Sequence, residues 1–136
     1  MRVIIDTNVW LVIIPEYSKY AFIYGLIREY KLAVILSNDI LLEYEELMKK
    51  RYPDASVDEE LEYLLKLPKT EFYSPTYFWN LIPNDPDDNK FVDCAIDADV
   101  DYIITNDKHF DILKTINFPS VSTLTLQEFM TILQPK

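Results

Sequence analysis

Short apolar runs that favour β-strands alternate along this chain with longer segments that favour helices. The strand candidates are four short segments: Arg2–Asp6, Leu32–Leu36, Tyr102–Thr105 and Val121–Thr123. The helix candidates lie between and after them: Ser18–Tyr30, a segment from Ser37 to about Arg51, Val57–Leu67, Asn89–Ala98 and Leu126–Leu133. A chain that alternates strands with helices builds a parallel sheet with helices on its faces. The pattern therefore predicts a three-layer α/β/α sandwich with a mostly parallel central sheet.

The chain has 136 residues, of which 49% are hydrophobic, so we expect one domain that spans residues 1–136. Thr7 and Asn8 follow the first strand, and either is expected to cap a short helix. The stretch from Phe72 to Asp88 is rich in proline and aromatic residues. We expect this stretch to be irregular or to contain one short strand.

Composition excludes several kinds of site. The single glycine, Gly25, excludes both common glycine-rich phosphate-binding loops, and the single cysteine, Cys94, excludes an intrachain disulfide and a cysteine-based zinc site. Cys94 is expected to be a core residue. No segment resembles a signal peptide, and none reaches the roughly 20 apolar residues that span a bilayer. We expect a cytoplasmic protein that does not enter a membrane.

The charge of the chain is strongly acidic. Acidic residues outnumber basic ones by 23 to 13, which gives a net charge of −10. Such a surface repels polyanions and acidic membranes, and it argues against a protein that coats nucleic acid through a basic face. The acidic excess is concentrated from Asp85 to Asp111, a segment with nine acidic residues and two basic ones. An enzyme that meets a phosphodiester at one local site through metal ions remains compatible with this charge.

Four carboxylates lie where a parallel sheet binds ligands, at the carboxyl ends of its strands. Asp6 ends the first strand, Asp107 follows the Tyr102–Thr105 strand, Glu43 lies at the edge of the apolar face of a helix, and Asp88 precedes the next helix in line with its inward residues. Simpler explanations exist for three of them. Asp88 and Asp107 are candidate helix N-caps, and Glu43 is a candidate edge residue that reaches solvent. Asp6 is the hardest to explain, because a carboxylate after a buried strand is costly unless it is paired or bound to a metal.

If the four side chains meet, their charges conflict, because each carboxylate raises the pKa of its neighbours. Divalent cations resolve the conflict. Oxygen ligands without histidine or cysteine favour Mg²⁺ or Mn²⁺, as one ion or two. Such a centre suits phosphodiester hydrolysis.

The segments around these acids resemble PIN-domain ribonucleases, and most of all the toxins of VapC-type toxin–antitoxin pairs. The similar segments are IIDTNV at residues 4–9, the helix that carries Glu43, DPDDNKFVDCA at 85–95, DYIITNDKHF at 101–110 and the closing segment Leu124–Phe129. The resemblance implies a PIN-like fold and a divalent-metal-dependent endoribonuclease that hydrolyses RNA. It also implies a homodimer that a small antitoxin protein holds inactive.

The resemblance assigns roles to individual residues. It implies that Mg²⁺ or Mn²⁺ binds to an acidic quartet: Asp6, Glu43, Asp88 and Asp107. Asn8 and Thr105 would support these ligands. Because several acids compete at residues 85–88, Asp87 is the alternative to Asp88. Asp93 is a further candidate acid, although its helical projection points toward solvent, and Lys90 and Lys108 are candidates for contacting the substrate phosphate.

Two other function classes compete with the nuclease. One is a PIN-fold interaction module that has lost catalysis. The other is a phosphoacceptor receiver domain, which needs paired acids at the end of the first strand, where this chain has Thr7 and Asn8.

Other residues are weaker candidates. His109, the only histidine, is expected to contact phosphate or solvent rather than to act as a general base. Lys49–Arg51 is expected to complement the C-terminal end of its helix rather than to bind RNA. An early aromatic group is either a dimer or antitoxin surface or ordinary packing: Trp10, Tyr17, Tyr20 and Tyr24.

Overall fold

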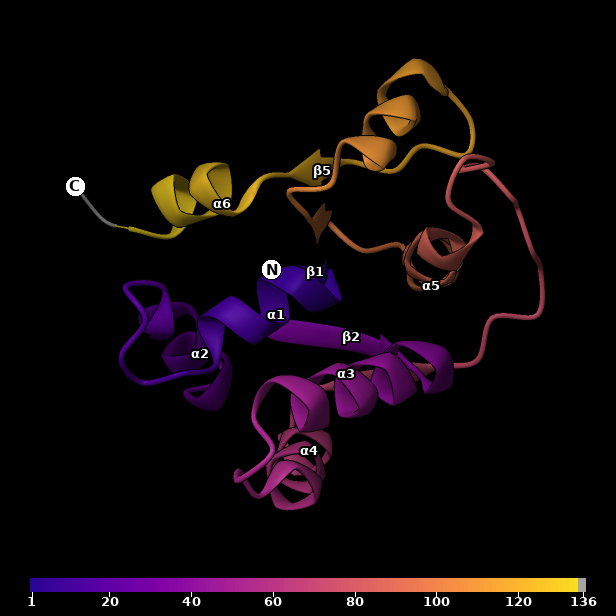
Figure 1. The fold of residues 1–136 in the computed structure, drawn as a ribbon. Helices are drawn as coiled ribbons and strands as arrows, with labels where there is room; N and C mark the ends of the chain where they lie inside the picture. The colour runs from indigo at the N-terminus through magenta and orange to yellow at the C-terminus, as the bar shows by residue number, and fades with distance from the viewer. Residues whose placement is uncertain (135–136) are drawn as a thin grey trace.

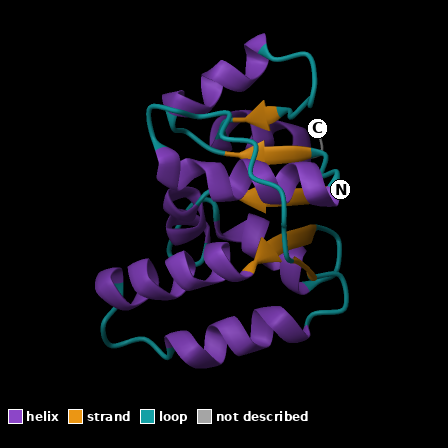
Figure 2. Cartoon of the chain, turned by 90° about the vertical axis from the view of Figure 1, so that its right-hand side faces the viewer, coloured by secondary structure: helices purple, strands orange, loops and turns teal. Residues whose placement is uncertain are grey.

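The centre of the protein is a parallel sheet, as a computed structural model that describes residues 1–134 shows. Its five strands are β1 (Arg2–Ile5), β2 (Ala33–Ser37), β3 (Glu71–Tyr73), β4 (Tyr102–Ile104) and β5 (Thr123–Leu124). The strands lie in the order β3-β2-β1-β4-β5, and each neighbouring pair is parallel (Figure 2). This order differs from the 2-1-3-4-5 order of receiver domains. The predicted parallel α/β class is therefore confirmed, and the receiver alternative is not supported.

Helices cover both faces of this sheet. The α-helices are α1 (Thr7–Ile13), α2 (Ala21–Arg28), α3 (Asn38–Arg51), α4 (Val57–Lys66), α5 (Asn89–Ala98) and α6 (Leu126–Leu133). Two 3-10 helices complete the fold, η1 (Pro86–Asp88) and η2 (Lys108–Thr115). Figures 1 and 2 together show α5 across one face of the sheet and α1, α2 and α6 on the other. The three predicted layers are present.

The core forms where the apolar runs of the central strands meet these helices. Val3–Ile5 and Val34–Leu36 are fully buried, as expected for strands covered on both faces. The ring of Trp10 from α1 stacks on the ring of Tyr44 from α3, with centroids 4.9 Å apart. Cys94 is a buried free thiol in α5, as predicted.

The early aromatic group divides between core and surface. Trp10 and Tyr24 are buried, whereas Tyr17 is 86% exposed. Tyr20 is half-buried. The group is therefore not one continuous surface, because the Trp10 and Tyr24 rings pack edge to face inside the molecule.

Several boundaries differ from the prediction. Neither Thr7 nor Asn8 caps α1, because the helix begins at Thr7 and Asp6 occupies the N-cap position without a side-chain capping bond in the described structure. The Phe72–Asp88 stretch contains the end of β3 and all of η1. The last strand begins two residues later and ends one residue later than predicted, at Thr123–Leu124. In the described part of the chain, no helix is long and apolar enough to cross a membrane.

Candidate functional site

Asp6 and Asp107 lie together because β1 and β4 are parallel neighbours. Ile5 pairs with Ile104, so the residues that follow the two strands leave the same edge of the sheet. The Asp6 side chain is nearly buried, at 6% exposure, and its Oδ2 accepts a hydrogen bond of 2.7 Å from the Thr105 hydroxyl. The same hydroxyl accepts a bond of 3.0 Å from the backbone N–H of Asp107. Thr105 therefore links the two acids, where the sequence placed it as a supporting residue.

The environment of Asp6 disfavours its charge. Burial raises the pKa of Asp6, the negative charges of Asp107 and Glu43 raise it further, and the hydrogen bond from Thr105 lowers it. A cation near Asp6 would relieve the first two effects.

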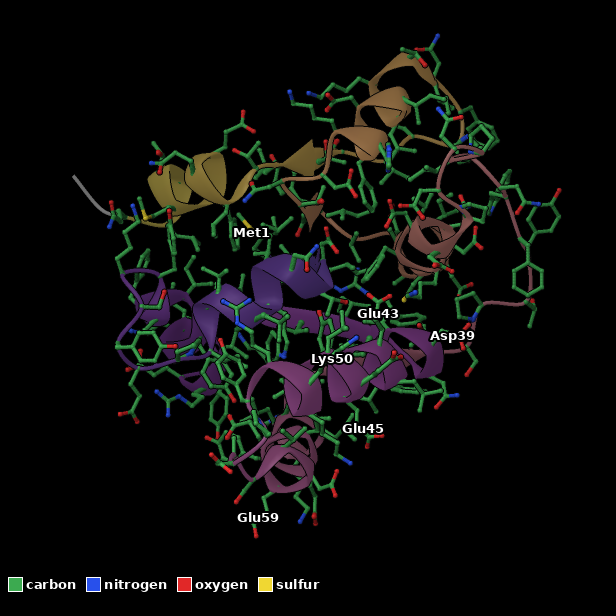
Figure 3. The ribbon with its side chains drawn as sticks, in the orientation of Figure 1. Met1, Asp39, Glu43, Glu45, Lys50 and Glu59 are labelled. Atoms are coloured by element: carbon green, nitrogen blue, oxygen red, sulfur yellow. The ribbon has the colours of Figure 1, made fainter. Side chains whose placement is uncertain are left out.

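Glu43 faces this site from α3. Ser37 caps the helix, since its hydroxyl accepts a hydrogen bond of 3.2 Å from the Ile40 N–H. Figure 3 shows Glu43 on the side of α3 toward the rest of the molecule and Glu45 on the outer side. The Glu43 carboxylate accepts a hydrogen bond from the Thr7 hydroxyl and pairs with the Lys90 ammonium at 2.7 Å.

These contacts give Lys90 a role at the site that differs from its predicted one, and they give Thr7 a role that the sequence did not indicate. Lys90 was predicted to contact substrate phosphate, and here it neutralises Glu43 from the neighbouring helix α5. Thr7 was considered only as a helix cap. Its position directly after Asp6 was the available signal.

Asp88 reaches the site from the junction of η1 and α5. It occupies the N-cap position of α5, but in the described structure its side chain makes no capping bond, so the simple capping explanation is wrong. The residue is 9% exposed, and its Oδ2 is buried without a hydrogen-bond partner among the described residues. Burial and the charges of Asp85, Asp107 and Asp6 raise the pKa of Asp88 to about 7. Asp87, the alternative to Asp88, is exposed.

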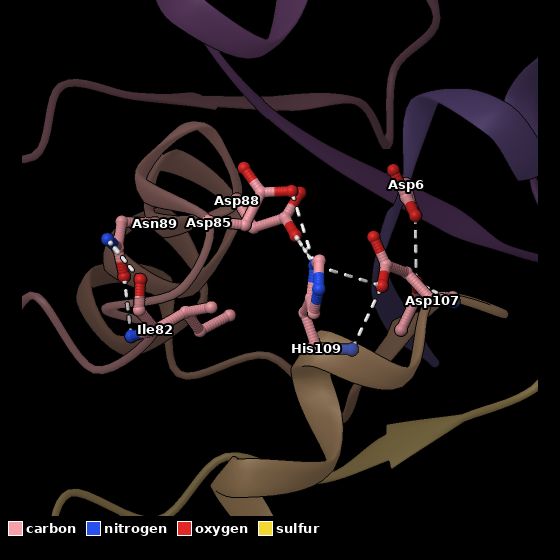
Figure 4. A network of polar contacts seen from close by, with 8 residues as sticks. Asp6, Ile82, Asp85, Asp88, Asn89, Asp107 and His109 are labelled. Atoms are coloured by element: carbon pink, nitrogen blue, oxygen red, sulfur yellow. Dashed lines mark hydrogen bonds and ion pairs between the residues drawn. The ribbon is translucent and has the colours of Figure 1, made fainter.

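His109 and Asp85 complete the acidic cluster (Figure 4). Asp107 caps η2 by accepting a hydrogen bond of 2.9 Å from the His109 N–H, as its simpler explanation predicted. This turn brings His109 Nδ1 to 3.3 Å from Asp85 Oδ2 and 3.4 Å from Asp107 Oδ1. Sequence reasoning missed Asp85, although it opens the run of competing acids at residues 85–88.

One predicted residue, Asp93, lies differently from expectation. Asp93 does not face solvent: it is 6% exposed, and its carboxylate accepts a hydrogen bond of 3.0 Å from the Trp79 N–H. The segment before η1 covers this side of α5, and burial raises the pKa of Asp93. Asn8 and Lys108 are both exposed, and no side-chain hydrogen bond or ion pair of either is found within residues 1–134.

Two open recesses flank the acids. The larger, of about 610 Å³, is lined by residues that include Glu43, Lys90, Phe78 and Asn80. The smaller, of about 380 Å³, is lined in part by Asp6 and Asn8. Each recess therefore borders part of the quartet, the larger at Glu43 and the smaller at Asp6 and Asp107.

The family model described as "PIN domain" matches residues 2–109. The chain belongs to the PIN-domain family. The match contains all four quartet acids and ends at His109, so the closing segment Leu124–Phe129 lies beyond it. No curated protein matches the chain.

This PIN domain is also similar to a solved structure, the crystal structure of VapBC2 from Rickettsia felis bound to a DNA fragment from their promoter. The TM-score is 0.61 and the identity 16%, and the alignment covers 92% of this chain and 98% of that one. At this identity the likeness shows a shared fold.

The residues of the PIN domain fit a divalent cation. The donors are mainly carboxylate oxygens, which Mg²⁺ and Mn²⁺ prefer. The buried Oδ2 of Asp88 makes no hydrogen bond within the described structure, although a buried carboxylate oxygen ordinarily has a partner. A cation among the acids would supply that partner and offset their mutual repulsion.

Proposed function

We propose that this PIN domain is a Mg²⁺- or Mn²⁺-dependent endoribonuclease and the toxin of a toxin–antitoxin pair. The observation that carries the proposal is the buried Oδ2 of Asp88, which has no hydrogen-bond partner among residues 1–134 and lies near the charges of Asp6 and Asp107. Carboxylates that repel one another lower the stability of a fold unless a cation binds between them. Carboxylates with strongly shifted pKa values are also concentrated at catalytic sites.

The residues that would hold one or two ions are the four acids of the quartet: Asp6, Glu43, Asp88 and Asp107. When bound, the ion would acidify a water molecule and supply positive charge to the scissile phosphate and the leaving oxygen. Thr105 fixes the orientation of Asp6 through its hydrogen bond. Thr7 holds Glu43 through a hydrogen bond from α1, whereas Lys90 neutralises Glu43 from α5.

Lys90 is the one basic residue among the described residues that line the larger recess, whose acidic residues are Asp39, Glu43, Glu46, Asp87 and Asp93. Its side chain is 19% exposed and pairs with Glu43, which lines the same recess. Within this recess Lys90 would attract a phosphate of the RNA, whereas the surrounding acids would repel it unless a divalent cation offset their charge. Asp87 and the exposed Asn8 stand at the edges of the recesses, outside the proposed ligand set.

The toxin role rests on the fold and on the family. One structural neighbour is VapBC2 bound to a DNA fragment from their promoter. We further propose that this chain is a homodimer, held inactive by a small antitoxin protein, that acts on cytoplasmic RNA. A short neighbouring gene that encodes a DNA-binding protein would support this part of the proposal.

The test is cleavage of end-labelled RNA by the purified protein in Mg²⁺, in Mn²⁺ and in EDTA. We expect cleavage only with metal, and we expect Asp6→Asn to lower the rate at least a hundredfold. The matched control is Asp54→Asn, which removes the same charge from an exposed turn away from the site and should keep near wild-type activity. Equal rates for the wild type and Asp6→Asn would refute the assignment, and the absence of both cleavage and metal binding would favour the catalytically inactive interaction module.

A further inference from the structure

The acidic cluster has two chemically different ends. At one end, Asp6 and Glu43 receive hydrogen bonds or an ion pair from Thr105, Thr7 and Lys90. At the other end, Asp88 Oδ2 is buried without a hydrogen-bond partner in the part of the chain that the structure describes. The buried carboxylate oxygen that a cation would stabilise most therefore lies at the second end.

The second end also contains a nitrogen donor. Asp85, Asp88, Asp107 and His109 each offer one ligand atom, and these atoms all lie within 4.8 Å of one another. His109 Nδ1 is 3.8 Å from Asp88 Oδ2, the oxygen that lacks a hydrogen-bond partner within residues 1–134. We propose that these four residues form a mixed oxygen and nitrogen metal site in which His109 is a direct ligand, and that this site selects Mn²⁺ over Mg²⁺. The inference rests on the proposed function only in that the acids bind a divalent ion.

The separations suit one cation. Ligand atoms bonded at about 2.1 Å in an octahedral shell stand about 3.0 Å apart when adjacent and about 4.2 Å apart when opposite. The three distances from His109 Nδ1 to carboxylate oxygens, 3.3, 3.4 and 3.8 Å, lie within this range. The His109 side chain is 48% exposed, so its ring has room for the small adjustment that the widest separation requires.

The backbone brings His109 to this position. Its N–H donates to Asp107 Oδ1 at 2.9 Å, which fixes the first turn of η2 beside the end of β4. The run from Asp85 to Asp88 approaches from the other side through η1. The ligand atoms of two segments, which lie about 20 residues apart in the sequence, thus come close together in the fold.

Imidazole nitrogen changes the metal preference of a carboxylate site. Mg²⁺ binds oxygen almost exclusively and gives up its waters reluctantly, whereas first-row transition metals accept imidazole readily. Replacing one of the oxygen ligands by His109 therefore favours Mn²⁺.

The first experiment is pulsed electron paramagnetic resonance on the full chain, free of any histidine tag, loaded with one equivalent of Mn²⁺. Because His109 is the only histidine in the sequence, a nitrogen-14 modulation typical of coordinated imidazole can come from no other residue. We expect this modulation in the wild type and its loss in His109→Ala. Bound Mn²⁺ without the modulation in the wild type would overturn the proposal without any variant.

The second experiment is calorimetric titration of both proteins with Mn²⁺ and with Mg²⁺. We expect His109→Ala to weaken Mn²⁺ binding at least tenfold and Mg²⁺ binding less than threefold. Equal losses for the two metals would overturn the role of His109 as a ligand and would leave the acidic nuclease site intact. Failure of the wild type to bind either metal would overturn the proposed function as well, so the two failures are distinguishable.

Discussion

The replacement Asp88→Asn should stabilise the metal-free protein at alkaline pH, although it removes a proposed catalytic group. In the folded chain, burial and the neighbouring acids raise the pKa of Asp88 from its ordinary 3.8 to about 7. Between these two pH values the folded protein keeps a proton that the unfolded chain has released. The free energy of unfolding therefore falls as the pH rises from about 4 to about 7, and the loss is complete above pH 7.

The size of the effect follows from the two pKa values. A difference of about 3 pKa units corresponds to at most about 4 kcal/mol of destabilisation from the charged form. The asparagine amide lies where Oδ2 has no hydrogen-bond partner in the described structure, and burying an unsatisfied amide costs on the order of 1 kcal/mol or more. We therefore expect a net gain of about 1 to 3 kcal/mol, or about 3 to 10 °C in melting temperature for a chain of this size.

The assay is thermal unfolding followed by circular dichroism in EDTA at pH 5 and pH 8. At pH 8 Asp88→Asn should melt above the wild type, and at pH 5 the gain should disappear because wild-type Asp88 is largely protonated there. Added Mn²⁺ should reverse the order at pH 8, because only the wild type keeps the full ligand set. The control Asp87→Asn carries the same change of charge at an exposed position and should shift the melting temperature little at either pH. A melting temperature of Asp88→Asn at pH 8 in EDTA that equals or falls below that of Asp87→Asn would refute the reasoning.

Three further predictions follow from individual contacts. Arg2 donates to both carboxylate oxygens of Glu71 at 2.8 Å, so Arg2→Ala should lower the free energy of unfolding by about 1 to 2 kcal/mol. Urea unfolding measures this, and an unchanged midpoint would contradict the prediction. Asp99 follows the last residue of α5 with a φ of 52°, a left-handed conformation that glycine adopts without strain. Asp99→Gly should therefore raise the free energy of unfolding by about 0.5 kcal/mol, and a decrease would contradict this reasoning. Lys90→Gln removes the positive charge 2.7 Å from Glu43, so calorimetry should show Mn²⁺ binding strengthened severalfold; weaker binding would mean that Lys90 does not compete with the ion for Glu43.

Helical geometry and strand ends were sufficient to predict where most of the acids lie. The predicted bounds of α5 and α6 agree with the structure, because both helices have clear apolar periodicity and α6 begins with a capping box at Thr125. The inward projection of Asp88 and the edge position of Glu43 follow from the same periodicity. Asp6 and Asp107 could be placed together because parallel strands bring their carboxyl ends to one edge.

Contacts made by irregular segments could not be predicted in this way. Asp93 projects away from the sheet, and it is buried because the proline-rich segment before η1 folds over α5, held by hydrogen bonds to Asp93 and Asn89. The spacing of apolar residues along α5 does not indicate that another segment packs over its outer side. The meeting of His109 with Asp85 depends on two turns 24 residues apart, which no local pattern specifies.

The scarcity of glycine had a further structural consequence. Gly25 lies inside α2, and the positive-φ positions of the described chain are occupied by Tyr30, Asn80 and Asp99. Composition predicted the absence of glycine loops, but it gave no sign of where the strained residues would stand.

The central claim is that this acidic protein meets RNA through divalent metal at one site, and the affinity for RNA with and without metal tests it most directly. The measurement is fluorescence anisotropy of a short 2′-O-methyl RNA, in EDTA and in Mg²⁺ or Mn²⁺, at matched ionic strength. Between Asp85 and Asp111 nine acids face two bases, so metal-free protein should repel the RNA. We predict affinity at least tenfold higher with metal, and equally tight binding in EDTA would contradict the account.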